Sequence, residues 1–451
     1  MNIIIVGGGK VGTTLTESLC NEKHNVVLID NNPKVIESII NTYDVMGICG
    51  NGASCDILSE ASINKAYLII ATTASDELNI LCCLIARKMG ARHCIARVRN
   101  PSYAQQLVFM RDELGLSMMV NPEYAAANEV SRMIRFPTAI KIEIFAKGRV
   151  ELVEINIKEN SPLAGLPLYK LYQLYKIKIL ICAVQRRDEV FIPDGNFILH
   201  AGDKIHITAG HSELAAFFKA TGILKNRIRS VLIIGGGTLA YYLTLQLVEI
   251  GIHVKIIEQD YQRCQHLSET LPKATIIHAD GTDPNVLNEE GIDDVDCCVT
   301  LTGIDEENIL IAMYANSKSV NKVISKVNRV SLLGILDSLG EESTVSPKAI
   351  TANSILRYIR AKQNTKGNSI RTLYRLVEGK VEALEFVISP NNRSIGIPLK
   401  ELSIRKNLLI ACIIRGNKVI IPNGNEKIKP NDSVIVVTTN QMLQDFDDIL
   451  K

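Results

Sequence analysis

Tryptophan is absent from this sequence, and aromatic residues make up only 5% of its 451 residues. Proteins that bind single-stranded nucleic acid depend on aromatic side chains on which bases stack. Positive charge is not in excess either, because 50 Lys and Arg face 48 Asp and Glu, for a formal net charge of +2. Phosphate contacts need a clustered basic surplus. The composition therefore argues against a nucleic-acid-binding protein.

Long apolar runs are also missing: none approaches the ~20 residues that a membrane-spanning helix requires. The N-terminus opens a strand and lacks the basic region and cleavage-like site of a secretory signal. The 11 cysteines form no C-x-x-C pair, and two adjacent pairs, Cys82-Cys83 and Cys297-Cys298, lie in apolar runs. This usage is typical of reduced, buried thiols. We therefore expect a soluble cytosolic protein that reaches a membrane only through a partner.

What the sequence does contain is an internal duplication. The segment IIIVGGGKVG at 3–12 returns as VLIIGGGTLA at 231–240, 228 residues later. The segment SDELNIL at 75–81 returns as IDEENIL at 304–310, 229 residues later. A period this long indicates duplicated domains rather than a solenoid.

Each copy divides into two parts that differ in their pattern of apolar and polar residues. In the first part short apolar runs alternate with helical patterns, which is typical of a doubly wound parallel sheet. In the second part closely spaced β runs such as KIEIF and VELVEINI surround one helix near 167–175. The predicted fold class is α/β, with two tandem Rossmann-like doubly wound parallel sheets, each followed by a small β-rich α+β lobe.

The predicted boundaries follow from these patterns. The first sheet is expected to use strands near 2–6, 25–29, 44–49, 67–71, 93–98 and 117–120, followed by a helix over 123–136 that Pro137 ends. The predicted domains are the nucleotide-type lobes 1–136 and 229–363 and the small lobes 137–220 and 370–451, with the polar stretch 362–369 as a linker.

The first glycine-rich loop, Gly7-x-Gly9-x-x-Gly12, follows a predicted strand and opens a predicted helix, as in dinucleotide-binding sites. Backbone N–H groups and the helix N-terminus would face a pyrophosphate. Asp30, at the end of the next strand, can accept hydrogen bonds from ribose hydroxyls and would repel a 2′-phosphate, which favours NAD(H) over NADP(H). Because Asn32-Pro33 supplies the next helix with a cap, we expect Asp30 to be free for the ligand. The alternative is that the glycines serve packing alone and Asp30 is a cap.

The second loop carries three changes. Ala240 replaces the last glycine, which is an accepted substitute, Glu258 replaces Asp30, and Asp280 replaces Asn51. The added negative charge is expected to tune or weaken the binding of an anionic ligand. A degenerate second site is the alternative.

Other candidates lie at the carboxyl ends of the predicted strands, where ligands of open α/β sheets bind. In the first lobe these ends carry Asn51-Gly52, Thr73-Ala74 and Arg97. Thr73 is a candidate for ribose or pyrophosphate contact and Arg97 for phosphate contact. The alternatives are a turn, a helix cap and a solvated charge.

A dehydrogenase would also need an acid–base group placed against the nicotinamide. Tyr172-x-x-x-Lys176 matches the pair of short-chain dehydrogenases, but it lies in a small lobe, and its counterpart in the second copy has no Tyr. His200, His206 and His211 straddle a predicted strand without a metal-ligand pattern. No Ser-His-Asp or nucleophile-elbow pattern is present. Two nucleotide sites without a catalytic group indicate a sensor rather than an enzyme.

The motifs occur in the order GGGKVG, GNGAS, SDELN, ARVRNP and IPDGN…AGDKIHITAG, and the arrangement then repeats. In this order the chain resembles the TrkA family, the NAD-binding regulatory subunits of bacterial Trk potassium uptake. Each copy resembles an RCK (regulator of potassium conductance) domain, and the resemblance covers essentially the whole chain.

The resemblance implies a peripheral protein on the cytoplasmic side of the inner membrane, assembled into a ring as a homo-oligomer. It would gate a membrane-embedded Trk-type potassium-translocating subunit, with NAD(H) at the first site and NAD(H) or ATP/ADP at the second. Lys326 matches Arg97 and keeps the charge without the bidentate fork. An NAD-dependent oxidoreductase and a regulatory subunit of another ion channel or antiporter are the alternatives. The implied nucleotide contacts are Gly7, Gly8, Gly9, Lys10, Val11, Asp30, Asn51, Gly52, Thr73, Ala74 and Arg97 in the first lobe, and Gly235, Gly236, Gly237, Thr238, Leu239, Glu258, Asp280 and Thr302 in the second.

Overall fold

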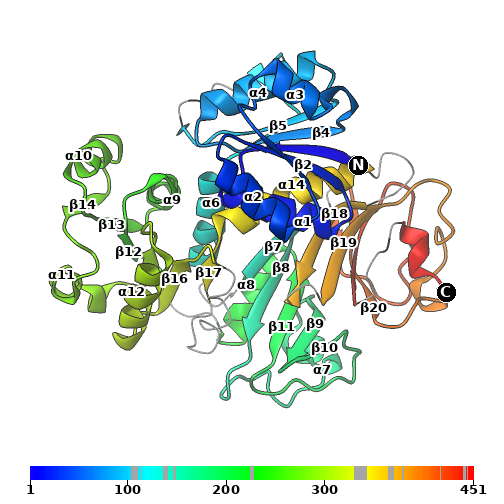
Figure 1. The fold of residues 1–451 in the computed structure, drawn as a ribbon. Coiled ribbons are helices and arrows are strands. Elements are labelled where there is room, and N and C mark those ends of the chain that lie inside the picture. Colours follow the sequence, from blue (N-terminus) through cyan, green and yellow to red (C-terminus); the bar gives the residue numbers. More distant parts are fainter. Residues whose placement is uncertain are drawn as a thin grey trace. The chain divides into compact units, whose positions relative to one another are not determined.

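The chain divides into two compact units in the computed structural model, and Figure 1 labels the elements of both. One unit combines Met1–Ser131 with Arg229–Leu356, and the other combines Arg132–Ile228 with Arg357–Lys451. The two nucleotide-type lobes therefore share one unit, and the two small lobes share the other. The structure describes residues 1–101, 103, 110–111, 113–135, 141–145, 149–223, 228–329, 343–363, 370–377, 380–416, 418–439, 443 and 445–451.

The first nucleotide-type lobe is built on a parallel six-stranded sheet of order β3-β2-β1-β4-β5-β6. Its central strands are apolar throughout because helices cover both faces, and Ile3, Ile4 and Ile5 of β1 are all buried. The strands are β1 (Asn2–Val6), β2 (Asn25–Asp30), β3 (Met46–Cys49), β4 (Leu68–Ala71), β5 (His93–Arg97) and β6 (Met118–Val120), and the helices are α1 (Lys10–Asn21), α2 (Pro33–Thr42), α3 (Cys55–Glu60), α4 (Asp76–Lys88) and α6 (Pro122–Arg135).

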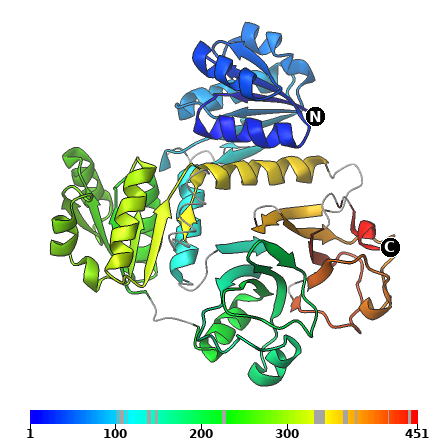
Figure 2. The ribbon, with the colours of Figure 1, turned by 60° about the horizontal axis from the view of Figure 1, so that its bottom comes forward.

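The second nucleotide-type lobe repeats this plan, with strand order β14-β13-β12-β15-β16-β17. Figure 2 shows its helices on both faces of the sheet. The strands are β12 (Ser230–Ile234), β13 (His253–Glu258), β14 (Thr275–His278), β15 (Cys297–Thr300), β16 (Lys322–Lys326) and β17 (Thr344–Val345), and the helices are α9 (Thr238–Glu249), α10 (Tyr261–Thr270), α11 (Pro284–Glu289), α12 (Asp305–Ser317) and α14 (Pro347–Gln363).

The two lobes of this unit touch through Tyr242 of α9. Its hydroxyl donates to the Arg99 carbonyl over 3.1 Å and accepts from Asn121 Nδ2 over 3.0 Å. Its ring meets that of Tyr124 edge to face, with centroids 5.3 Å apart. Helix α9 of the second lobe therefore lies against the β5–α6 region of the first.

Each small lobe is a five-stranded antiparallel sheet, of order β10-β9-β11-β8-β7 in the first and β18-β19-β22-β20-β21 in the second. The expected single helix of the first lobe is α7 (Tyr169–Tyr175), but a second helix, α8 (His211–Ala220), was not predicted. It forms because Leu214, Phe217 and Phe218 give one buried face. The strands are β7 (Lys141–Phe145), β8 (Val150–Asn156), β9 (Leu180–Arg186), β10 (Glu189–Phe191), β11 (Lys204–Ala209), β18 (Ile370–Leu376), β19 (Val381–Val387), β20 (Leu408–Arg415), β21 (Lys418–Ile420) and β22 (Ser433–Thr438).

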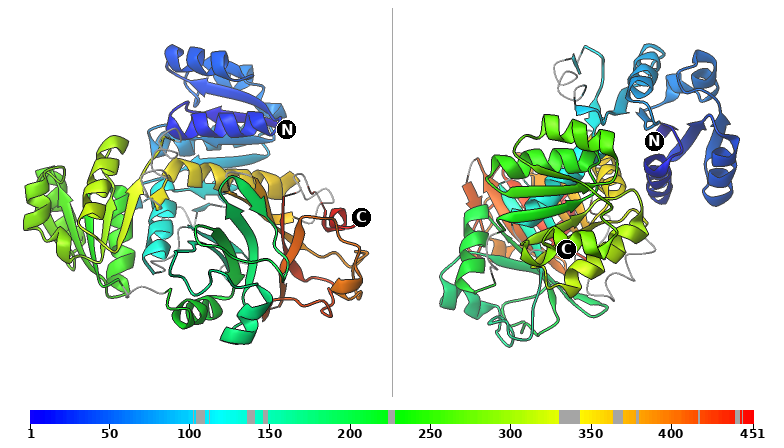
Figure 3. Two further views of the ribbon diagram at one scale, coloured as in Figure 1. Left: turned by 90° about the horizontal axis from the view of Figure 1, so that it is seen from below. Right: turned by 90° about the vertical axis from the view of Figure 1, so that its left-hand side faces the viewer.

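The sheets of the two small lobes lie side by side (Figure 3). They share an apolar core, which we call the seam. In the seam the Phe145 and Tyr374 rings pack edge to face, with centroids 4.7 Å apart. The β9 ladder and the β20 ladder each contain an irregularity at the seam. The buried seam residues are Phe145, Val150, Leu152, Cys182 and Ala183 from the first lobe, and Leu376, Val381, Ala383, Ala411, Cys412, Ile414, Ile435 and Val437 from the second.

The architecture confirms the predicted fold class. Pro137, which was expected to end the helix over 123–136, lies outside the described residues, as do residues 364–369 of the expected linker. Residues 362 and 363 of that stretch belong to α14. Among the helices that can be described, none combines the length and apolar character needed to cross a membrane.

Candidate functional site

The first glycine-rich loop is closely packed at Gly7, Gly8 and Gly12 and open at Gly9. Gly7 has a φ of +99°, and a Cβ there would lie 2.9 Å from the carbonyl carbon of Thr72. A Cβ at Gly12 would lie 1.9 Å from the Gly7 carbonyl oxygen, whereas one at Gly9 would meet no atom within 4 Å. Gly9 is the residue before α1, whose first-turn N–H groups have no acceptor inside the helix. The loop is therefore open where an anion would approach those donors.

The second loop has the same backbone form. Gly235 has a φ of +98°, and a Cβ at Gly237, the residue before α9, would again meet no atom within 4 Å. Ala240 occupies the place of Gly12 and is buried. Both loops thus present an open helix N-terminus, and they differ in how tightly the first helical turn packs on the loop.

The strand-end acids are not free, and this corrects the expectation for Asp30. Asp30 Oδ2 accepts a hydrogen bond from Gly8 N over 2.7 Å, and Oδ1 accepts one from Asn32 N over 2.8 Å. Asn32 does cap α2, as predicted, by accepting from Lys34 N over 3.0 Å. A carboxylate has about four lone-pair sites, so acceptor capacity remains for ribose hydroxyls. Asp30 therefore both holds the glycine loop and stays able to bind a ligand.

Glu258 does the same in the second lobe, with one more methylene. Its Oε2 accepts from Gly236 N over 2.6 Å and its Oε1 from Asp260 N over 2.9 Å. Arg263 on α10 adds a further contact, because its Nε donates to the Gly236 carbonyl over 2.7 Å, whereas Val35 is at the equivalent position of the first lobe. The Arg263 guanidinium therefore lies beside the second loop, and the sequence analysis did not identify this residue.

Asn51 and Asp280 shape turns at the ends of β3 and β14. Asn51 Oδ1 accepts from Ala53 N over 3.0 Å. Asp280 Oδ1 accepts from the backbone N and the hydroxyl of Thr282, over 2.9 and 2.7 Å. These hydrogen bonds lower the pKa of Asp280 and keep it ionised. A Cβ at Gly52 would lie 2.2 Å from Val6, so this glycine lets the turn approach β1.

Thr73 is held by a buried residue that the sequence analysis did not single out. Its backbone N and its hydroxyl both donate to Asn79 Oδ1, over 2.7 and 2.8 Å, and Asn79 Nδ2 donates to the Thr73 and Arg97 carbonyls. Asn308 makes the same bonds to Thr302 N, Thr302 O and Lys326 O. The side-chain cap of α4 is Ser75, not Thr73. A single amide thus ties the ends of two strands together in each lobe.

Arg97 is the best candidate for an anion contact in the first lobe. Its Nη2 donates to the Thr73 carbonyl over 2.5 Å, while its buried Nε has no hydrogen-bond partner among the described residues. Burial, with the nearby Arg99 charge, lowers the pKa of the guanidinium. A buried donor without an acceptor is unfavourable, and an anionic ligand would relieve it.

Lys326 occupies the same place in the second lobe, and its ammonium donates to the Leu301 carbonyl over 3.2 Å. Burial lowers the pKa of the Lys326 ammonium. The negative charge of Asp305 raises this pKa, and the positive charge of Lys10 lowers it further. Lys10, the residue after the first glycine run, therefore lies close enough to Lys326 to act on its pKa.

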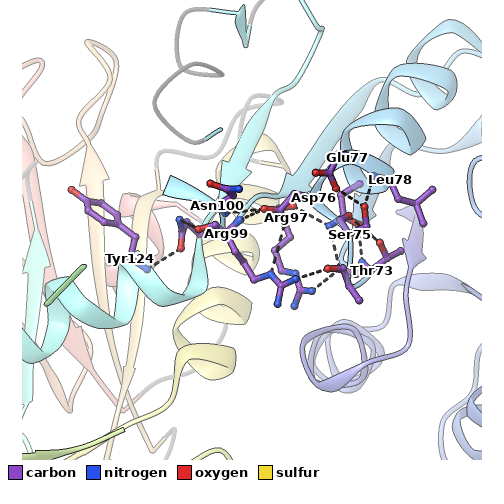
Figure 4. A network of polar contacts seen from close by, with 12 residues as sticks. Thr73, Ser75, Asp76, Glu77, Leu78, Arg97, Arg99, Asn100 and Tyr124 are labelled. Carbon is purple, nitrogen blue, oxygen red and sulfur yellow. Dashed lines mark hydrogen bonds and ion pairs between the residues drawn. The ribbon is translucent and has the colours of Figure 1, made fainter. Parts of the chain in front are cut away.

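The loop after β5 is anchored by a buried carboxylate (Figure 4). Asp76 Oδ2 accepts from the backbone N of Arg99 and of Asn100, each over 2.8 Å. The Arg99 side chain donates to the Ala74 carbonyl, so Arg97 and Arg99 both reach the loop of Thr73 and Ala74. Asp305 makes the equivalent pair of backbone bonds in the second lobe.

A cavity of about 700 Å³ lies between the two nucleotide-type lobes. The first lobe contributes the loops after β4 and β5 and the start of α6, and the second contributes the start of α9 and one side of α10 along its length. Glu123 lines it with a buried Oε2 that has no hydrogen-bond partner within the described ranges, and burial raises its pKa. The cavity joins the strand ends of one site to the glycine loop of the other. Its ionisable side chains are Asp76, Glu77, Arg99, Tyr103, Glu123, Tyr241, Arg263 and His266.

The residues considered for catalysis lie elsewhere. Tyr172 is exposed on α7 of the first small lobe, and Lys176 is the residue that follows this helix, with a φ of 58°. His206 is buried in β11, and His200 and His211 lie on either side of that strand. In the part of the chain that the structure describes, no three His, Cys, Asp or Glu side chains form a group that could hold a metal ion.

Comparison with protein families gives two matches that alternate along the chain. The model described as the TrkA-N domain matches residues 3–122 and 231–347. The model described as the TrkA-C domain matches residues 152–222 and 383–451.

Curated relatives match along the full length. The Trk system potassium uptake protein TrkA homolog 1 of Methanosarcina mazei is 32% identical over 446 residues, which are 97% of this chain and 97% of the relative. The Trk system potassium uptake protein TrkA of Haemophilus influenzae is 29% identical, over 98% of this chain and 96% of its own.

Solved structures described as the GsuK channel and as the GsuK channel bound to NAD match with TM-scores of 0.66 and 0.64, at 18% identity. They cover 98% and 99% of this chain, and 77% and 78% of their own. At this identity the likeness shows the fold alone. The relatives and structures named here are uptake proteins and a channel, not enzymes.

Proposed function

The chain belongs to the TrkA family, and from this premise we propose that it is a nucleotide-sensing regulatory subunit of a potassium uptake system. The observation that carries the proposal is the order of the family matches, which places the same two domains twice along one chain. Full-length relatives named as potassium uptake proteins support it. The four domains of the proposal are 1–136, 137–220, 229–363 and 370–451.

We assign NAD(H) to the first lobe. The open position at Gly9 and the unpartnered Nε of Arg97 both suit a pyrophosphate, and the spare acceptor sites of Asp30 suit a ribose. The solved structure described as bound to NAD supports a nucleotide of this kind on this fold. The residues proposed to hold the ligand are Gly7, Gly8, Gly9, Lys10, Val11, Asp30, Asn51, Gly52, Thr73, Ala74 and Arg97.

We assign NAD(H) or an adenine nucleotide, ADP or ATP, to the second lobe, where Glu258 would take the ribose. A structure described as GsuK bound to ADP, with a TM-score of 0.52, supports this range of ligands. The residues proposed to hold the ligand are Gly235, Gly236, Gly237, Thr238, Leu239, Glu258, Asp280 and Thr302.

The proposed mechanism is a population shift and not a reaction. A ligand moves a conformational equilibrium only by the difference in its affinity for the two states. The cavity between the lobes would supply such a difference if the lobes move, because Arg99 and Glu123 of one lobe line it together with Arg263 of the other. A change in how these lobes meet alters the surroundings of both sites together. Bound nucleotide would supply negative charge there, and no acid–base group of this chain is assigned to act on it.

We further propose that the protein works on the cytoplasmic side of the inner membrane as a ring-shaped homo-oligomer. It would be attached there through a Trk-type potassium-translocating membrane subunit that it gates. With a net charge of +2, direct attraction to anionic lipid is weak, since each basic residue near the surface contributes only about 1 kcal/mol. Many copies of one weak contact on a ring would add by avidity.

Three measurements test the proposal. Asp30→Ala should weaken NADH binding by about 1–3 kcal/mol in calorimetry, and Asp30→Arg should shift preference toward a 2′-phosphorylated cofactor.

The protein should sediment with membranes only when its transporter is present, and it should wash off at high salt. Steady NADH consumption with a physiological substrate, or equal membrane recovery without any Trk-type transporter, would contradict the proposal.

A further inference from the structure

The order of strands in the second lobe determines which part of a bound nucleotide would lie at the end of each strand. β12 leads into the glycine loop, β13 ends at Glu258, and β14 ends at His278, which pairs with Glu258 in the ladder. The proposed function places phosphate at the loop and ribose at Glu258. The base is attached to the ribose on the side away from the phosphates, so it reaches the end of β14.

Two aromatic rings lie at that end. Tyr261, the first residue of α10, is 60% exposed, and its ring centroid lies 5.4 Å from that of the exposed His278, at an interplanar angle of 68°. Exposed tyrosine rings are poorly hydrated on their faces, and every base has a π-face that stacks on such a ring. The corner therefore offers an apolar surface directly beyond the proposed ribose position.

The hydrogen bond of His278 defines which of its nitrogens is available. Nε2 lies 3.0 Å from the Gln259 carbonyl, which can only accept, so Nε2 carries the proton of the neutral ring. Nδ1 is then left as an acceptor. An acceptor matches the exocyclic amino group of adenine, which donates, and it repels the carbonyl oxygen that hypoxanthine has in the same place.

The first lobe does not have this corner. Pro33 stands where Tyr261 stands, and Cys49 stands where His278 stands. The Cys49 thiol donates to the Asn31 carbonyl over 3.8 Å, which is the counterpart of the His278–Gln259 bond. Pro33 and Cys49 offer neither a stacking ring nor an imidazole acceptor at these two positions, so the two lobes differ in what would meet the base.

We propose that the second nucleotide-type lobe selects its ligand by the base: Tyr261 stacks on a purine, and His278 Nδ1 accepts a hydrogen bond from the amino group of adenine. The inference rests on the proposed function, because it requires that this lobe bind a nucleotide. It deepens that proposal by naming the two residues that would recognise adenine, the base that NAD(H), ADP and ATP share.

The test compares ADP with IDP, whose base has a carbonyl oxygen in place of the amino group at C6 and a proton on N1. The full-length Gly9→Asp variant is used throughout, to silence the first site, and affinities are measured by calorimetry. ADP should bind roughly tenfold tighter than IDP, and His278→Ala should bring the ratio close to one by weakening ADP. Tyr261→Ala should weaken both ligands by roughly tenfold, and Tyr261→Phe should keep both.

Two exposed residues serve as matched controls. His253→Ala lies at the opposite end of β13, and Tyr172→Ala lies in a small lobe, so both should leave the ADP-to-IDP ratio unchanged. Equal affinity for ADP and IDP in the Gly9→Asp parent, or an ADP preference that survives His278→Ala, would overturn this inference alone. If neither nucleotide binds the Gly9→Asp parent while ADP binds a Gly237→Asp variant, the second site itself is refuted, and the proposed function with it in that part.

Discussion

In the first nucleotide-type lobe a carboxylate at the end of β2 accepts from Gly8 N, and in the second a carboxylate at the end of β13 accepts from Gly236 N. Asn79 and Asn308 tie strand ends in the same way in both lobes. The side chains toward the proposed ligand are different: Arg97 against Lys326, and Cys49 against His278. Duplication has thus kept the carboxylate and the amide that hold the backbone of the site, while the side chains at the ends of β3 and β5 differ from those at the ends of β14 and β16.

The sharpest way to test this comparison is to place a carboxylate at each open glycine. Gly9→Asp should lower the affinity of the first site for NADH more than a hundredfold, because like charges forced together cost several kcal/mol. Potassium uptake at low external potassium should fail with it. Gly237→Asp should affect only the second site.

A Cβ at either position meets no atom within 4 Å, so both variants should fold, which thermal unfolding will check. Normal NADH affinity in Gly9→Asp would rule out the first loop as the pyrophosphate site.

The next largest effect concerns packing. Gly12→Ala should destabilise the first lobe by about 2 kcal/mol, because the added Cβ would overlap the Gly7 carbonyl oxygen. The second lobe already has an alanine there, so Ala240→Gly should change stability by about 1 kcal/mol or less, mainly through helix propensity. Hydrogen exchange of β1 and β12 measures each lobe separately. Equal losses in both lobes would mean that the loops pack alike.

Some features of the two sites could be predicted from the sequence, and others could not. The glycine loops, the strand-end acids and the parallel sheets were predictable because they depend on local spacing and periodicity. The engagement of Asp30 by Gly8 N was not, since it depends on two loops meeting. Asn79 and Asn308 had no local signature either, because one amide on a helix gains its role only from the strands beside it. The cavity that joins the lobes depends on contacts more than a hundred residues apart.

A smaller effect is expected from exchanging the two strand-end cations. Arg97→Lys should weaken NADH at the first site by about 1 kcal/mol, because the ammonium lacks the planar fork that suits a phosphate. Lys326→Arg should strengthen nucleotide binding at the second site by a similar amount. Calorimetry measures the nucleotide affinity of each variant, with the other site blocked by Gly237→Asp or Gly9→Asp. An unchanged first-site affinity in Arg97→Lys would indicate that the guanidinium serves only the Thr73 carbonyl.

The smallest effect is a change in thiol reactivity. Cys49 is exposed at the end of β3, where the base of a first-site nucleotide would lie, and Cys55 is exposed at the start of the next helix, α3. Cys20 is half-buried beyond the site, and the other thiols are buried. NADH should slow the alkylation of Cys49 and Cys55 a few-fold and leave Cys20 unchanged, as read by mass spectrometry. Protection of all three alike would indicate a general tightening of the lobe rather than a ligand over β3.

The seam between the small lobes has a consequence for how the two halves can differ. At its ladder irregularities it carries Cys182-Ala183 from one lobe and Ala411-Cys412 from the other, the same two residue types in opposite order. In a dimer of identical subunits every contact residue must suit a second copy of its own surface. Here the two surfaces belong to one chain, so each needs to suit only the other, and their local concentration does not fall on dilution. Because they are covalently linked, the two seam surfaces do not have to remain identical. Each half of the chain can therefore acquire a different ligand specificity while the two small lobes stay packed together.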